Sequence, residues 1–91
     1  MILPVDELVD VPVYITDIDT GDALNGVHII ITSINNLETF ECTTGLDGMC
    51  TLYDIPIGEY QYTIHKDNYS DETGIIEIST GSSIAESLNY G

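Results

Sequence analysis

The chain of 91 residues carries sixteen acidic side chains and a single basic one, Lys66, so its net charge at neutral pH is −15. Because contacts to phosphate groups require Lys and Arg, this balance argues against nucleic-acid binding and against docking on anionic lipid. Hydrophobic residues make up 43% of the chain, an ordinary share for a globular domain, and no apolar run reaches the ~20 residues of a membrane-spanning helix.

The first ten residues lie outside any strand pattern and are predicted to form an extended N-terminal arm, with a single domain over residues 11–91. The arm, MILPVDELVD, has neither a basic start nor a long apolar stretch, so it does not resemble a secretory signal. We expect the chain either to be made without a signal or to be a trimmed piece. The apolar residues of the arm that could contact the domain or a partner are Ile2, Leu3, Val5, Leu8 and Val9.

Seven short strands are predicted after the arm, because apolar and β-branched residues alternate between clusters of Gly, Asp, Asn and Ser. The expected strands are 11–18, 27–34, 38–44, 49–53, 59–65, 74–79 and 83–90. No segment shows a helical signal. The series predicts an all-β fold, a seven-stranded antiparallel sandwich of the immunoglobulin-like type.

The loop after the first predicted strand, DIDTGD, places three carboxylates close together. Asp17, Asp19 and Asp22 could gather a cation such as Ca²⁺, since carboxylates on one loop repel each other. The spacing does not fit an EF-hand, because the twelfth position is His28 rather than Glu. The simpler interpretation is a solvated turn in which Asp side chains bond to nearby backbone. We therefore expect no cofactor, with Ca²⁺ as the alternative.

The second predicted strand is apolar on both of its faces. If alternate residues of Val27–Ile31 face the core, Ile30 and Ile34 point to the opposite side, where a sheet with one wet face would carry polar residues. We expect either the arm or another chain to cover these two isoleucines.

Two cysteines flank the segment TTGLDGM between the third and fourth predicted strands. If these strands form a hairpin, Cys42 lies opposite Cys50 and a cross-strand disulfide is geometrically possible. Two reduced, buried thiols are the alternative in a chain without a secretion signal. Two Cys and two unrelated His do not form a zinc pattern.

The segment YDIPIGEY combines a sharp turn with an aromatic residue in the strand that follows. Pro56 fixes φ and Gly58 permits a positive φ, so the chain turns before the next strand. Tyr60 matches a tyrosine corner, in which the hydroxyl bonds to upstream backbone at a crossover between sheets. We expect an architectural role for these three residues.

Two stretches of the chain resemble a known family of β-sandwich domains. VYITDIDTGDALNGVHIIIT is similar to the opening of carboxypeptidase regulatory-like and Cna protein B-type domains, and TTGLDGMCTLYDIPIGEYQYTIHKDNY is similar to their middle. The matched residues are Thr20, Gly21, Leu24, Gly26, Val27, Thr44, Gly48, Leu52, Ile55, Pro56, Gly58, Tyr60 and Tyr69. The resemblance implies a transthyretin-like (prealbumin-like) sandwich. It also implies an appended, non-catalytic module, as found in surface adhesins, secreted enzymes, outer-membrane receptors and virus particles.

Some pilin and adhesin members of that family join a Lys of the first strand to an Asn or Asp of the last strand. Lys66 lies after the fifth predicted strand and the first strand has no amine, so we expect no such isopeptide bond. His28 and His65 lie in predicted strands without a paired nucleophile, and no G-x-S-x-G motif is present. We therefore expect no enzymatic activity.

The sequence thus predicts a structural or interaction module that binds other protein subunits of a larger assembly, with a homo-oligomer compatible with this role. Virus particles assemble inside the host and need no secretion signal, so the first interpretation is a component of the exterior, tail or fibre of a phage-like particle. The alternative is a carbohydrate- or surface-binding module of a cell-surface protein. The chain has no Trp, and most of its tyrosines lie in predicted strands, which weakens the carbohydrate alternative.

Overall fold

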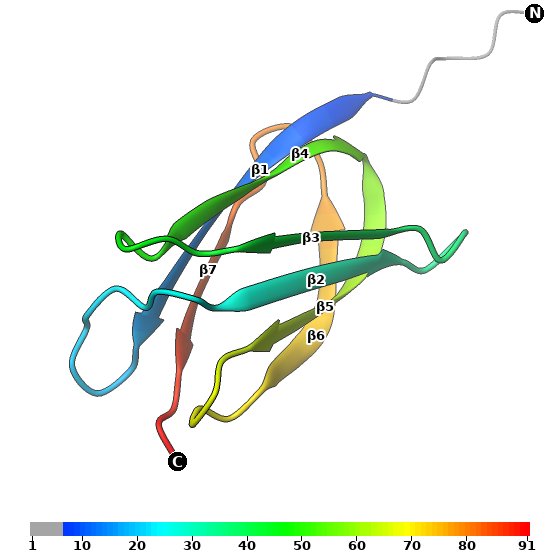
Figure 1. Cartoon of the computed structure of the whole chain (residues 1–91). Coiled ribbons are helices and arrows are strands. Elements are labelled where there is room, and N and C mark those ends of the chain that lie inside the picture. The colour runs from blue at the N-terminus through cyan, green and yellow to red at the C-terminus, as the bar shows by residue number, and fades with distance from the viewer. Residues whose placement is uncertain (1–6) are drawn as a thin grey trace, which may run out of the picture.

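The computed structural model describes residues 7–91, which form seven β-strands in two sheets that pack face to face (Figure 1). The strands are β1 (Leu8–Asp17), β2 (His28–Ser33), β3 (Thr39–Thr43), β4 (Met49–Pro56), β5 (Gly58–His65), β6 (Glu72–Ile78) and β7 (Ile84–Leu88). The predicted seven-stranded, all-β sandwich is confirmed. Residues 7–91 contain no helix long and apolar enough to cross a membrane.

One sheet has three strands in the order β4-β1-β7, and the other has four in the order β3-β2-β5-β6. Every pairing is antiparallel except that of β1 with β7, which is parallel from Val13↔Ile84 to Asp17↔Leu88. The expectation of a wholly antiparallel sandwich is therefore wrong at this pair. After β6 the chain returns to the first sheet, where β7 lies beside β1 and runs in the same direction (Figure 1).

β1 begins at Leu8, earlier than the boundary at residue 11 that the sequence suggested. Leu8 and Val9 pair with the end of β4, and the carbonyl of Glu7 accepts a hydrogen bond from the backbone of the β4–β5 turn at 3.2 Å. The described part of the predicted arm is therefore a part of the three-stranded sheet. Residues 1–6 lie outside the described part of the chain.

The core lies between the two sheets, because alternate residues of each strand point to the same face. Its buried hydrophobic residues are Val11, Val13, Ile15, Leu24, Val27, Ile29, Ile31, Leu52, Ile55, Tyr60, Ile64, Ile78, Ile84 and Leu88. Since these side chains fill the space between the sheets, contacts with other molecules fall to the outer faces, the loops and the two open sides of the sandwich.

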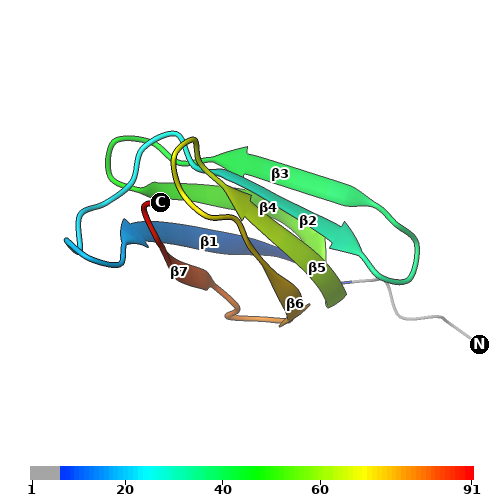
Figure 2. The ribbon, with the colours of Figure 1, turned by 90° about the horizontal axis from the view of Figure 1, so that it is seen from below.

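The open side between β3 and β4 is closed by a disulfide. Cys42 and Cys50 are joined by an S–S bond of 2.07 Å, with their Cα atoms 6.1 Å apart. The prediction that β3 and β4 pair as a hairpin, on which the cross-strand disulfide was based, is wrong. β3 pairs with β2, and β4 pairs with β1. The bond therefore links the two sheets. The other open side lies between β7 and β6 (Figure 2).

Candidate interaction surface

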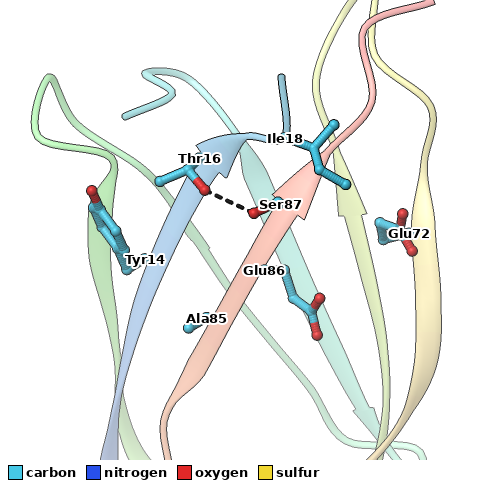
Figure 3. Close-up of a pocket in the computed structure, with 7 residues that line it drawn as sticks. All are labelled: Tyr14, Thr16, Ile18, Glu72, Ala85, Glu86 and Ser87. Carbon is cyan, nitrogen blue, oxygen red and sulfur yellow. Dashed lines mark hydrogen bonds between the residues drawn. The ribbon is translucent and has the colours of Figure 1, made fainter. Parts of the chain in front are cut away.

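An open groove of about 570 Å³ runs along β7 on this second side of the sandwich (Figure 3). Its lining residues come from β1, β6 and β7 and the residue that follows β1: Tyr14, Thr16, Ile18, Glu72, Ala85, Glu86 and Ser87. The groove therefore combines part of the outer face of one sheet with the edge strand of the other.

The outer face of β1 and β7 supplies an uncharged wall of the groove. The parallel register places Tyr14 beside Ala85 and Thr16 beside Ser87, and the Oγ atoms of the latter pair lie 2.9 Å apart (Figure 3). Tyr14 is 42% exposed and Ile18 is 54% exposed. An aromatic ring and an aliphatic side chain are thus available to a binding partner.

Two carboxylates form the opposite wall. Glu86 lies on the inner face of β7, the face opposite to that of Ala85 and Ser87. Glu72 comes from β6 (Figure 3). Both act on one hydroxyl: burial raises the pKa of Tyr62, and the charges of Glu86 and Glu72 raise it further. The chain's one basic side chain is engaged elsewhere, because Lys66 Nζ donates to the carbonyl of Asn25 at 2.7 Å. Negative charge on this side of the sandwich is therefore not neutralised by a Lys or Arg of the same chain.

The predicted cation loop is instead organised by Asp17. Its Oδ1 accepts the backbone N–H groups of Asp19 at 2.8 Å and Thr20 at 3.2 Å, and its Oδ2 accepts the hydroxyl of Tyr69 at 2.7 Å. These bonds, the one from Tyr69 above all, hold the pKa of Asp17 below its usual value. The same bond, together with burial and the nearby carboxylates, raises the pKa of Tyr69 to about 12. Asp22 is exposed. Among residues 7–91 no three His, Cys, Asp or Glu side chains are arranged to hold a metal ion.

Tyr60 has the geometry of the predicted tyrosine corner. The chain crosses from the three-stranded to the four-stranded sheet between Pro56 and Gly58, whose φ is 150°. The Tyr60 hydroxyl donates to the Pro56 carbonyl at 2.7 Å, and the ring packs edge-on against Phe40. These residues therefore shape the crossover, and none of them lines the groove.

The apolar residues assigned to interactions fall in three places. Ile2, Leu3 and Val5 lie outside the described residues. Leu8 is exposed and Val9 packs against the core, both within the three-stranded sheet. Ile30 lies half-buried on β2, in the other sheet, and Ile34 is 44% exposed just beyond β2. That a second chain covers Ile30 and Ile34 stays a prediction.

The two histidines face each other across β2 and β5, since His28 pairs with His65. His65 Nδ1 lies 2.6 Å from Asp71 Oδ1, a hydrogen bond that raises the pKa of His65, and His28 Nε2 lies 3.5 Å from Glu41 Oε1. Both imidazoles thus contact carboxylates rather than a hydroxyl or thiol nucleophile.

Neither a protein-family model nor a curated protein sequence matches the chain. Solved structures match it in fold. The pilus 2b backbone protein of group B Streptococcus has a TM-score of 0.68 and 19% identity, over 90% of this chain and 41% of that one. The 5-hydroxyisourate hydrolase of Klebsiella pneumoniae has a TM-score of 0.65 and 17% identity, over 90% of both chains.

The major pilin subunit of Bacillus cereus has a TM-score of 0.62 and 13% identity, over 88% of this chain and 29% of that one. This chain therefore spans less than half the length of either pilus protein. At these identities the likeness concerns the fold alone. The fold of this chain is the transthyretin-like, Cna B-type β-sandwich that its motifs predicted.

Proposed function

We propose that this chain is a non-catalytic structural module of an assembly at a cell surface, in which it contacts other protein subunits. The likeness in fold to a pilus backbone protein and to a major pilin subunit carries this proposal. In both of those proteins the matching part is one portion of a longer chain, which is the arrangement expected of a repeated or appended structural domain.

The path of the chain favours the same role. β1 begins at one end of the sandwich, and the residues after β7 leave at the other end (Figure 1). Because β1 and β7 are parallel neighbours, tension between these ends loads their hydrogen bonds in shear. Bonds loaded in this way must break together rather than one after another, which suits a module that transmits force.

The compared structures favour a cell surface over a virus particle, because they include pilus proteins and none of those described above is a virion protein. The phage-like interpretation from the sequence rested on the sequence of the first ten residues, which lacks the features of a secretory signal. The structural likeness is the stronger argument, since it extends over 90% of the chain.

Hydrolytic activity, as named for the Klebsiella protein, is the second candidate. Acyl-transfer chemistry of the serine-hydrolase type needs a nucleophile and a base in contact within a cleft. In this chain the hydroxyls of Thr16 and Ser87 line the groove without an imidazole, and His28 and His65 lie in the four-stranded sheet. This arrangement does not provide a nucleophile and base of the serine-hydrolase type in the groove.

Immunogold labelling with antibodies raised against the purified chain tests the proposal on intact cells of the source organism and on its virus particles. We expect label on the cell surface, and we expect cross-linking mass spectrometry to join the chain to other surface proteins. Label confined to virus particles or to the cell interior would overturn the proposal. A rate of 5-hydroxyisourate hydrolysis above the uncatalysed rate would overturn the non-catalytic assignment.

A further inference from the structure

The edge of β7 offers backbone groups for one additional strand. The carbonyl of Leu88 accepts a hydrogen bond from the backbone N–H of Ile18 at 3.0 Å, so the backbone polar groups of Leu88 point toward β1. Because these groups alternate in direction along a strand, those of Glu86 also point toward β1. The N–H and C=O groups of Ala85 and Ser87 therefore point away from the sheet. Within the described part of the chain, β7 pairs with β1 alone.

The β4 edge of the same sheet is less suited to such pairing. Tyr53 and Asp54 together face Asp10, which makes a β-bulge, and the strand ends at Pro56. β4 is also tied to the other sheet by the disulfide at Cys50. β7, with the sequence IAESL, contains neither Pro nor Lys and has a continuous register with β1.

We propose that the β7 edge binds an extended segment of a partner protein that carries a Lys or Arg flanked by small or apolar residues. The proposal rests on the proposed function as a module that contacts other subunits, and it specifies one surface of contact. In a strand added beside β7, side chains alternate between the two sides of the sheet. The residue beside Glu86 therefore points toward Glu72, and its two neighbours point to the outer face, beside Ala85 and Ser87.

Charge selects a basic segment over a second copy of this chain. Two copies, each with a net charge of −15, repel each other, and pairing through β7 would bring Glu86 of each copy to the same open side. Charged residues that point inward at a sheet edge are a known protection against unspecific pairing. The same two carboxylates attract a cationic side chain, because opposite charges on neighbouring strands stabilise pairing. Repulsion of acidic chains and attraction of basic ones together give specificity.

The groove adds apolar contact to this charge pairing. Ile18 is exposed and lies over the end of β7, so side chains of an added strand can contact it (Figure 3). Thr16 and Ser87 share one hydrogen bond within the wall, in which either hydroxyl can be the donor. The other hydroxyl keeps its proton for a bond to a side chain of the added strand or to water.

The test uses the whole chain and short capped peptides of alternating Val and Thr with one central residue changed. The first peptide has a central Lys, and the second has Glu at the same position. Two further peptides keep the Lys but are N-methylated at every second residue, one at the odd positions and the other at the even positions. NMR titration at low salt should show that the Lys peptide shifts the amide signals of Ala85 and Ser87 and slows their hydrogen exchange. The Glu peptide should not bind. Of the two N-methylated peptides, only the one methylated at the N–H groups that face β7 should lose binding.

Two variants separate local recognition from general attraction. Glu86→Gln should weaken binding of the Lys peptide about threefold to tenfold, as expected for a partly exposed charge pair. Glu77→Gln removes the same charge from an exposed site on β6 and should leave the affinity within about twofold. Thermal unfolding followed by circular dichroism establishes that both variants are folded.

The proposal would be overturned if the two N-methylated peptides bound with equal affinity. It would also be overturned if Glu86→Gln and Glu77→Gln weakened binding of the Lys peptide equally. Either result is compatible with immunogold label at the cell surface. Failure of this binding proposal can therefore be distinguished from failure of the proposed function.

Discussion

Replacing Tyr60 with Phe tests the crossover between the sheets with the removal of a single oxygen atom. The ring is 2% exposed and keeps its packing, so the change isolates the hydrogen bond of 2.7 Å to the Pro56 carbonyl. Such a bond contributes roughly 0.5–1.5 kcal/mol, and a carbonyl left without a donor adds a desolvation penalty where water does not replace the hydroxyl. We expect the free energy of unfolding to fall by about 1–2 kcal/mol.

Urea denaturation followed by circular dichroism measures this difference, and in a domain of this size a loss of ~1 kcal/mol lowers Tm by roughly 4–8 °C. Tyr53→Phe is the matched control, because it removes the same oxygen atom from a residue that is 67% exposed. The slope of the urea transition should be the same in both variants, since neither changes the surface exposed on unfolding. Equal midpoints for the Tyr60 and Tyr53 variants would refute the assignment of a tyrosine corner.

Three further changes probe the loops and the disulfide. Replacing Cys42 and Cys50 with Ser should lower the free energy of unfolding by about 2–3 kcal/mol, because the bond closes a short loop in the unfolded chain; urea curves of variant and wild type that coincide would contradict this. Gly48→Ala should lower Tm more than Gly21→Ala, because φ is positive at both but an added Cβ meets a backbone oxygen at 2.8 Å only at Gly48. Equal Tm values would contradict the close packing. Asp17→Asn should destabilise the domain at neutral pH, and its deficit should shrink as the pH falls below 3.8. The stabilisation from a carboxylate with a lowered folded-state pKa is full above the unfolded pKa and is lost as the pH falls through the folded pKa, so a deficit independent of pH between neutral and acid would contradict this origin.

The strands and the core could be predicted because the alternation of apolar residues is a local property. Ile29 and Ile31 are buried while Ile30 between them is partly exposed, as the pattern requires. The tyrosine corner could be predicted for the same reason, since Tyr60 and its acceptor Pro56 are four residues apart.

The choice of strand partners could not be predicted from the same signals. The segment between β3 and β4 reads as a hairpin turn, yet the two strands join different sheets. Partner choice depends on which strands bury the most surface together, and this is decided over long separations in the chain. The assumed hairpin register placed Cys42 opposite Cys50, with a disulfide and two reduced thiols as alternatives. The two cysteines meet in spite of the wrong pairing, because two chain segments joined by a short loop stay close in either topology.

One carboxylate of the groove, Glu86, is recognisable in the sequence as a charged residue at an apolar position of the strand pattern. Glu86 lies between Ile84 and Leu88, both buried, so it occupies an inward-facing position in a strand. An acidic residue at such a position indicates either an edge strand or a buried charge pair. Only the strand order shows that β7 is an edge, and that Glu72 of β6 lies on the same side of the sandwich.

The two open sides of the sandwich are protected by different physical means. Between β3 and β4 the disulfide links the sheets covalently, so the two strands are held together whatever molecule approaches. Between β7 and β6 the described residues provide carboxylates, Glu86 and Glu72, whose effect depends on the charge of the molecule that approaches. Salt screens such an effect over about 10 Å at 0.1 M ionic strength, so higher salt should weaken both the repulsion of acidic chains and the attraction of basic ones. A side protected by charge is open to a partner of opposite charge, so the carboxylates beside β7 favour a basic added strand over an acidic one.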